Sequence, residues 1–229
     1  MPDAGIIEPD ETGNGARKAV LCPTTGATLH SHYPLGSRVA ALVEIRIRVP
    51  PAIPPGPICL IGPGGAGKTT TGLELGALLK RRVVDLDRAF HGRIEHIGSY
   101  IRTNGYEKYV EENSTLAHKL TAEITGEEIF VFSSGFLATD VRSDTVGRNR
   151  ALVRATGYSI LLLPSGDVDR ASEIVVQRQL GRGFGLEAGR EERKFRARFP
   201  QYMQHGDMQV FSESAPSVIA RAIAERLGL

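Results

Sequence analysis

The residues with the clearest chemistry are Gly62 to Thr69, which read Gly-Pro-Gly-Gly-Ala-Gly-Lys-Thr and fit the pattern G-x-x-x-x-G-K-[ST]. A loop that lacks side chains at most positions can curl tightly enough to aim several backbone N–H groups at one anion. Lys68 adds a mobile positive charge, and Thr69 adds a hydroxyl for Mg²⁺ at the start of a helix. The pattern predicts a P-loop, which holds the phosphates of a nucleoside triphosphate.

The segments on either side of this loop have the pattern that a P-loop requires. Residues 58–61 (Ile-Cys-Leu-Ile) are an apolar run suited to a strand that is buried on both faces. Residues 70–81 place apolar side chains at helical spacing and end on cations, which favour the last turn of a helix. Strand, glycine loop and helix follow in the required order, which favours a phosphate site over a glycine-rich turn that binds nothing.

Two carboxylates follow the next predicted strand, at residues 82–85. Asp85 and Asp87 share one side of an extended segment, so both could face the phosphates. One could help to hold Mg²⁺, and the other could accept a proton from a substrate hydroxyl, as phosphoryl transfer requires. The structural alternative is a solvated turn that caps a helix, and the nearby P-loop favours the functional interpretation.

A second cluster is basic and lies between residues 178 and 198. It includes Gly181-Arg182-Gly183-Phe184-Gly185, whose glycines suit a mobile flap that closes over reacting groups. Two glutamates interleave with the cations, so a solvated helix face explains the middle of the cluster equally well. For Arg182 and Arg198 we prefer a role toward developing negative charge. A nucleic-acid surface is disfavoured, because the glutamates dilute the charge and few aromatic residues are available for stacking.

Alternating strand and helix patterns must position these groups. Apolar runs predict further strands at residues 129–132, 158–163 and 208–211, with helical stretches between them and a last helix over 216–227. Such alternation predicts an α/β fold whose parallel sheet is covered by helices on both faces. Ligands of such sheets bind at the carboxyl ends of the strands, where the P-loop and both aspartates would lie.

The first 57 residues differ from the rest of the chain. Up to about residue 37 they are rich in Gly, Pro, Thr and Asp, which predicts disorder. Residues 43–49 alternate apolar and charged side chains with the period of a half-buried strand, and a proline-rich linker follows at 50–57. This strand could be an added edge strand, a partner-binding element or the byproduct of an overlong start site. We expect residues 1–57 to be an extension of a P-loop domain at residues 58–229.

Composition narrows the class of protein. The chain has 229 residues and is 41% hydrophobic, so it can bury one sizeable core. Its net charge of +2 does not favour any particular kind of partner. It has only two cysteines, Cys22 and Cys59, no apolar run of about eighteen residues and no signal-peptide pattern at its N-terminus. We therefore expect a cytosolic protein that neither spans a membrane nor relies on disulfides. Nothing in the pattern indicates an oligomeric state, and no set of histidines has metal-ligand spacing.

In their order and spacing, these motifs resemble the shikimate kinase family over roughly residues 58–229. The resemblance rests on the P-loop, Asp85-Leu86-Asp87, Asn149-Arg150-Ala151-Leu152 with Gly157, and Arg198-Phe199-Pro200-Gln201-Tyr202 leading to Asp207. It implies a three-layer P-loop kinase with a five-stranded parallel sheet, a small substrate-binding subdomain and a lid. It also implies an ATP- and Mg²⁺-dependent enzyme that transfers the γ-phosphoryl group to a small-molecule alcohol, with shikimate as the leading acceptor.

The resemblance also implies residue roles. Lys68, Asp87 and Arg182 would be catalytic, with Asp87 binding substrate hydroxyls and acting as the base. Thr69 and Asp85 would support Mg²⁺, and Arg198 would contact the substrate carboxylate. The expected nucleotide-binding residues are Gly64, Gly65, Ala66, Gly67, Lys68, Thr69, Thr70 and Arg178, and the expected acceptor-binding residues are Asp87, Ser134, Gly135 and Arg198.

Two departures from the family pattern concern the acceptor. Ser133-Ser134-Gly135 stands where the family has three glycines, and Gly105-Tyr106-Glu107 stands where the family has Gly-Phe-Arg. A glutamate that faced a carboxylate would repel it, so either Arg102 or Lys108 replaces the arginine, or the acceptor is another polyol or cyclitol. The remaining alternative is a ligand sensor with weak or no turnover, against which the intact phosphate residues argue.

Overall fold

The computed structural model describes residues 43–52, 56–182 and 185–229. The segment predicted to be disordered lies outside the described residues, as do the middle of the proline-rich linker and residues 183–184 of the predicted flap. None of the described helices is long and apolar enough to cross a membrane.

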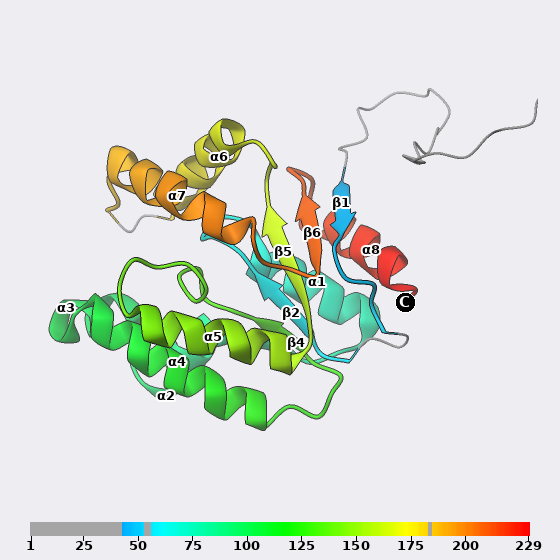
Figure 1. Ribbon diagram of the computed structural model, residues 1–229, viewed down its shortest axis with the longest axis horizontal. Helices are drawn as coiled ribbons and strands as arrows, with labels where there is room; N and C mark the ends of the chain where they lie inside the picture. Colours follow the sequence, from blue (N-terminus) through cyan, green and yellow to red (C-terminus); the bar gives the residue numbers. More distant parts are fainter. Residues whose placement is uncertain (1–42, 53–55, 183–184) are drawn as a thin grey trace, which may run out of the picture. The chain divides into compact units, whose positions relative to one another are not determined.

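The described strands form one sheet of six, in the order β1-β6-β5-β2-β4-β3 (Figure 1). Strands β2 to β6 run parallel to their neighbours, and β1 pairs antiparallel with β6 at one edge. The five predicted parallel strands are therefore confirmed, and the alternating segment near residue 45 forms an added edge strand. The strands are β1 (Glu44–Ile47), β2 (Ile58–Ile61), β3 (Val83–Asp85), β4 (Ile129–Val131), β5 (Tyr158–Leu163) and β6 (Met208–Phe211).

Eight described helices cover this sheet. They are α1 (Lys68–Leu79), α2 (Leu86–Arg93), α3 (Ile97–Asn104), α4 (Tyr106–Ala122), α5 (Ser143–Thr156), α6 (Val168–Leu180), α7 (Ala188–Tyr202) and α8 (Pro216–Leu227). The helix after the P-loop ends at Leu79, earlier than predicted, because Lys80 adopts a left-handed conformation with φ 53°. The cations expected in its last turn therefore lie just beyond it.

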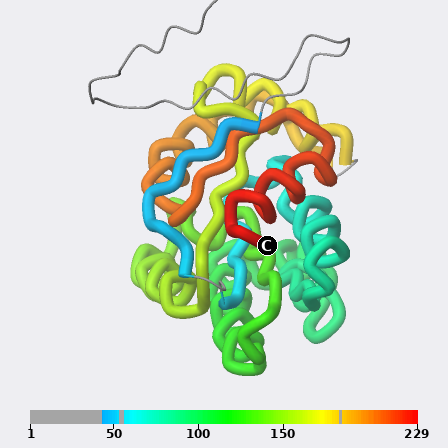
Figure 2. The backbone as a smooth tube through the Cα atoms, turned by 90° about the vertical axis from the view of Figure 1, so that its right-hand side faces the viewer, coloured from blue at the N-terminus to red at the C-terminus, as the bar shows by residue number. Residues whose placement is uncertain are grey.

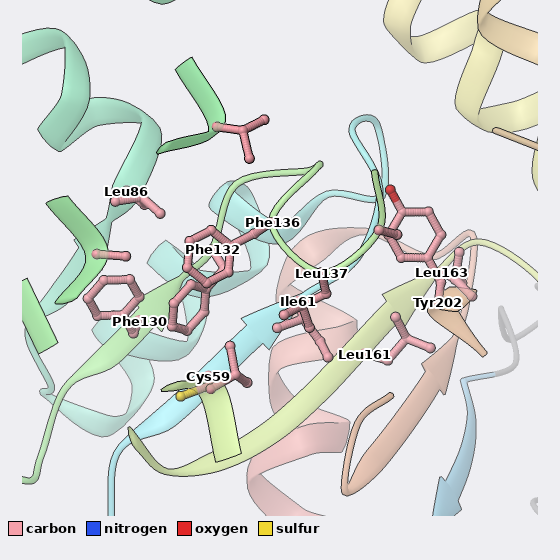
Figure 3. Packing of buried hydrophobic residues seen from close by; sticks show 14 of the residues in the cluster. Cys59, Ile61, Leu86, Phe130, Phe132, Phe136, Leu137, Leu161, Leu163 and Tyr202 are labelled. Atoms are coloured by element: carbon pink, nitrogen blue, oxygen red, sulfur yellow. The ribbon is translucent and has the colours of Figure 1, made fainter. Parts of the chain in front are cut away.

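Both faces of the sheet are covered by helices and buried. Successive residues of a strand point to opposite faces, so they join two different core clusters. On β2, Cys59 and Ile61 join the cluster shown in Figure 3, which packs against α2, α4, α5, α6 and α7. Ile58 and Leu60 join a second cluster with α1 and α8. The chain thus has the predicted three layers, helices on each side of a central sheet.

The edge strand β1 has a buried side and an exposed side. Ile45 and Ile47 pack with the second cluster, next to β6. Arg46 lies on the other side, with its guanidinium carbon 4.6 Å from the centre of the Phe211 ring. Figure 2 shows β1 running beside β6 at the edge of the sheet.

Candidate active site

The P-loop connects β2 to α1 at the carboxyl ends of the parallel strands. Gly62 has φ 136°, and a Cβ atom there would collide with the backbone oxygen of Leu162 on β5. Gly67, at the N-terminus of α1, has φ 86°. Side chains rarely tolerate such backbone conformations, so glycine allows the loop to pass close to β5 and then turn into the helix.

Lys68 is buried inside the curve of this loop. Its Nζ atom donates hydrogen bonds to the backbone oxygens of Gly62 and Pro63, at 2.8 and 2.9 Å. Burial lowers the pKa of the ammonium group to about 8, and the charges of Asp87 and Asp85 oppose only part of this effect. Since its hydrogen-bonded partners are neutral carbonyls, the ammonium group would gain most from a polyanion in the loop.

Thr69 and Asp85 are in direct contact. The Thr69 Oγ1 atom donates to Asp85 Oδ2 at 2.7 Å, and Asp85 Oδ1 accepts the backbone N–H of Arg88 at 3.0 Å. Asp85 therefore caps α2, as the structural alternative predicted, and also presents an oxygen beside the P-loop. A hydroxyl and a carboxylate are hard oxygen donors that suit Mg²⁺. Among the described residues no group of three or more His, Cys, Asp or Glu side chains could hold a metal, so phosphate oxygens and water would complete the shell.

Asp87 lies in the first turn of α2 and is held by a serine of the next crossover. The Ser133 Oγ atom donates to Asp87 Oδ1 at 2.5 Å and lies 3.4 Å from Asn113 Oδ1. Ser133 and Asn113 are both buried. Burial and the charge of Asp87 raise the pKa of the adjacent Tyr109, so its phenol stays protonated. The carboxylate of Asp87, which is itself exposed, is thus held against polar groups of α4 and of the segment after β4.

One cavity of about 80 Å³ brings most of the predicted residues together. Lys68, Asp87 and Arg182 all contribute to its wall. Arg182 and Lys68 line the same cavity, and the positive charge of Arg182 contributes to the lowered pKa of Lys68. The full lining is Pro63, Gly64, Gly65, Gly67, Lys68, Thr69, Thr70, Asp87, Val131, Phe132, Ser134 and Arg182.

Helix α6 packs against the outside of the P-loop. The Arg178 Nη1 atom donates to the backbone oxygen of Gly65 at 3.2 Å. The side chain of Gln179 lies so close to Gly64 that a Cβ atom there would collide with its amide. Ala66 points into the core, so only its backbone is available to a ligand. Arg178 therefore contacts the loop, and Gln179 is a contact that the sequence did not indicate.

Arg198 lies in a second, smaller cavity of about 30 Å³, which shares Pro63, Gly64 and Ser134 with the first. This arginine is 9% exposed, and its Nη2 atom donates to Asp140 Oδ1 at 2.8 Å. Asp140 itself is on the surface, with a side chain that is 83% exposed. A buried arginine with an exposed carboxylate partner can exchange that partner for the carboxylate of a ligand.

Gly135 and Ser134 line the approach to Arg198. The Tyr106 hydroxyl stands 2.8 Å from the position of a Cβ atom on Gly135, so a larger residue would displace it. The Tyr202 hydroxyl donates to the backbone oxygen of Ser134 at 2.8 Å. The two tyrosines thus fix the path of this loop between the two cavities.

The structure places Glu107 away from this approach. Glu107 is exposed in the first turn of α4, whereas its neighbour Tyr106 turns toward Arg198. Arg102 donates to Ser99 and Lys108 donates to Glu111, both at the surface. Neither cation, nor Glu107, is among the residues that line the two cavities. Arg198 is the arginine that lines the smaller of the two cavities, and Arg182 lines the larger one.

Sequence reasoning missed three residues that contact the predicted ones. Asn113 could have been noticed as a polar side chain on the apolar face of its helix, between Val110 and Ala117. Gln179 and Asp140 carried no such signal, because an exposed loop aspartate or a helical glutamine fits many positions equally well.

A P-loop between β2 and α1, carboxylates after β3 and arginines on α6 and α7 define a P-loop kinase fold. The chain belongs to the shikimate kinase family: the family model described as shikimate kinase matches residues 64–228. It is thus related to phosphotransferases, as its site geometry indicates.

Solved shikimate kinases share the fold at low sequence identity. The enzyme from Acinetobacter baumannii, in complex with shikimate, superposes with a TM-score of 0.62 at 21% identity, covering 74% of this chain and 91% of that one. The enzyme from Aquifex aeolicus gives a TM-score of 0.59 at 17% identity, covering 75% of this chain and 96% of that one. Among curated proteins, the pentafunctional AROM polypeptide of Candida glabrata is 38% identical over 80 residues. That match covers 34% of this chain and 5% of the much longer polypeptide.

Proposed function

We propose that this protein is a kinase that transfers the γ-phosphoryl group of ATP to a hydroxyl of shikimate, with Mg²⁺. The observation that carries the proposal is the single cavity in which Lys68, Asp87 and Arg182 meet beside the P-loop. Lys68 is a cation that would bind the phosphates, Asp87 is a candidate base, and Arg182 is a second cation, from the predicted lid. Their combination matches the needs of phosphoryl transfer, which relies on positioning and on charge stabilisation.

The nucleotide half of the site fits a triphosphate. Bound ATP would supply the phosphoryl group, and bound Mg²⁺ would offset the negative charge of its phosphates. Lys68 would turn from the two backbone oxygens toward the phosphates, while Thr69 and Asp85 would hold the metal. Arg182 would stabilise charge on the transferred group, which is the role that a mobile arginine has in this class of reaction.

The acceptor half of the site fits an alcohol that also carries a carboxylate. Asp87 would accept the proton of the attacking hydroxyl, and Ser133 would hold the carboxylate in place for this step. Arg198 would bind the carboxylate of the acceptor in place of Asp140. A small ring with a hydroxyl bound by Asp87 and a carboxylate bound by Arg198 would be held in one orientation across the two cavities.

A second candidate is a kinase for another polyol or cyclitol. The family's second arginine is replaced by Glu107, and neither Arg102 nor Lys108 lines the cavities in its place. Ser133 and Ser134 also add hydroxyls where the family has glycine. Fewer positive charges and more hydroxyls shift the balance toward acceptors with less negative charge.

An ADP-release assay over shikimate, quinate and a panel of neutral cyclitols separates the candidates. If the protein is a shikimate kinase, shikimate should give the largest increase in ADP release. Activity on a neutral cyclitol with no response to shikimate would support the second candidate instead. Silence across the panel, together with tight calorimetric binding of one compound, would indicate a sensor without turnover.

We further propose that the kinase is cytosolic, because the chain has few cysteines, and that residues 58–229 carry the chemistry. Residues 1–57 would be an extension, of which β1 adds an edge to the sheet. We propose neither a nucleic-acid nor a membrane partner.

A further inference from the structure

A second polar cavity, of about 220 Å³, lies near the amino ends of β5 and β6. It shares no lining residue with the P-loop cavity. Its wall combines Arg48, which follows β1, with Arg150 and Arg154 of α5. His205 and Asp207 contribute from the turn between α7 and β6. Three separate parts of the chain therefore direct polar side chains toward one space.

The positive charges in this cavity are not neutralised by the protein. Arg48 donates to the backbone oxygen of Gln204 at 2.8 Å, and Arg150 donates to the backbone oxygen of Leu137 at 3.0 Å. Both acceptors are neutral. Among the described residues, no acidic side chain lies within salt-bridge distance of Arg48, Arg150 or Arg154. Three guanidinium groups thus share a pocket with one carboxylate, that of Asp207, and none of the three forms an ion pair with a described residue.

The one carboxylate that lines the cavity is already engaged. Asp207 Oδ2 accepts hydrogen bonds from the backbone N–H and the hydroxyl of Ser159, at 2.8 and 2.7 Å. A contrasting cavity beside β3 is lined by Arg82, Arg88 and Arg93, but two carboxylates, Asp85 and Glu123, also line it, and Arg82 and Arg93 form ion pairs with Glu128 and Glu123. The surplus of positive charge is therefore a feature of the cavity near β5 and β6, and not of arginine-lined cavities in this chain generally.

His205 also lines the cavity. Its Nε2 atom is shielded from solvent and makes no hydrogen bond in the structure. Burial, followed by the charges of Arg150, Arg154 and Arg48, lowers the pKa of this imidazole to about 4. The ring is therefore neutral at physiological pH. The three arginines therefore supply the attraction for an anion, and the ring of His205 is a neutral reporter in the wall of the cavity.

We propose that this cavity binds a phosphate dianion, either free or as the monoester of a small molecule. Guanidinium groups recognise phosphate oxygens through paired charged hydrogen bonds. The bound anion would join Arg48 of the edge-strand segment to Arg154 of α5. It would therefore also stabilise the attachment of β1 to the sheet.

The test follows the ring signals of His205 by NMR in the full chain. A non-hydrolysable ATP analogue and Mg²⁺ first saturate the P-loop, so that added phosphate cannot report on that site. Inorganic phosphate is then titrated, and a phosphate monoester such as methyl phosphate is titrated separately, with sodium chloride at matched ionic strength as the blank. We expect a saturable shift of the His205 signals with phosphate and not with chloride. A stronger response to the monoester would identify an esterified ligand as the better fit.

Two arginine variants on the same helix provide the comparison. Arg154→Ala removes a guanidinium group from the cavity, and Arg148→Ala removes an equal charge from the exposed surface of α5, where it pairs with Asp144. Arg154→Ala should weaken phosphate binding about tenfold, the loss expected for one charged hydrogen-bonding partner. Arg148→Ala should leave the binding unchanged. Phosphate should also raise the unfolding temperature of the wild type and of Arg148→Ala more than that of Arg154→Ala.

Two results would overturn the inference. One is the absence of a saturable His205 shift in the wild type. The other is an equal shift in Arg154→Ala and Arg148→Ala, which would show that the anion does not use the cavity. Both variants affect exposed side chains, so their circular dichroism spectra should match that of the wild type.

Discussion

The Ser133 hydroxyl donates a 2.5 Å hydrogen bond to the carboxylate of Asp87. Ser133 comes from the crossover after β4, and Asp87 comes from the first turn of α2. The bond therefore ties the candidate base to the segment that should approach the acceptor. It also gives a local role to a serine that stands where related sequences are expected to have glycine.

Removing this hydroxyl should slow the reaction without weakening nucleotide binding. In Ser133→Ala, we expect kcat to fall about tenfold, the cost of losing one charged hydrogen bond that orients a reacting group. The KM for ATP should not change. Steady-state ADP-release kinetics measure both. Ser114→Ala is the control, because its buried hydroxyl bonds Asn149 at 2.5 Å, away from the site, and should affect stability alone. An unchanged kcat in Ser133→Ala would refute this role.

Arg198 should act on the carboxylate of the acceptor. Arg198→Met is expected to raise the KM for shikimate at least about tenfold, because a buried charged pair is lost. The matched control is Arg196→Met on the same helix, whose guanidinium group pairs with Asp169 and Glu192 at the surface. Asp140→Asn should lower this KM, since it removes the internal competitor. An equal effect of Arg198→Met on acceptors with and without a carboxylate would contradict the assignment.

The edge strand β1 should contribute stability and not chemistry. Ile45→Ala is expected to lower the free energy of unfolding by about 1–3 kcal/mol, because Ile45 packs against the core beside β6. Glu44→Ala, on the exposed side of the same strand, should change it by less than about 0.5 kcal/mol. Urea unfolding measures both. A loss of kcat in Ile45→Ala at a temperature where it is fully folded would point to a role in catalysis instead.

Glu128 should couple stability to acid pH. Burial alone would raise its pKa, but hydrogen bonds from the Thr125 backbone, from Arg82 and from the Thr125 hydroxyl lower it to about 2. A pKa below the ordinary value means that the ionised form stabilises the fold. The contribution is complete above the ordinary value of 4.5 and is lost as the pH falls toward about 2.

The comparison is between Glu128→Gln and the exposed neighbour Glu127→Gln. Glu128→Gln should be less stable than the wild type at neutral pH, and the difference should shrink as the pH falls below 4.5. Glu127→Gln should follow the wild type at every pH. Urea unfolding across this range provides the test, and a difference for Glu128→Gln that stays constant down to pH 2 would exclude the proposed coupling.

The strands and the phosphate residues could be predicted because their signals are local. Apolar runs gave the five parallel strands, and Pro216 at a first turn gave the start of α8. The P-loop pattern placed Lys68 and Thr69 in one short segment. The order of these segments then indicated that Asp85 and Asp87 would lie at the same edge of the sheet.

Contacts between residues far apart in the chain could not be predicted from the sequence. Asp140 and Arg198 lie 58 residues apart, and nothing in either segment identifies the other as its partner. Pairing of β1 with β6 joins still more distant segments, so the alternating pattern left its position open. The orientation of Glu107 depends on where α4 begins after Gly105, whose φ of 84° sets the direction of the first turn. Periodicity alone could not tell that Tyr106 would turn inward and Glu107 outward.

Shikimate-dependent ADP release in the wild type and in Lys68→Ala tests whether this protein phosphorylates shikimate with its P-loop lysine. We predict clear turnover in the wild type and a loss of about a hundredfold or more in Lys68→Ala, because transition-state charge loses its buried cation. Lys119→Ala, an exposed lysine of α4, should retain full activity, and all three proteins should show the same circular dichroism spectrum. Equal shikimate-dependent turnover in Lys68→Ala and the wild type would contradict the proposed function, as would a wild type that never releases ADP in response to shikimate.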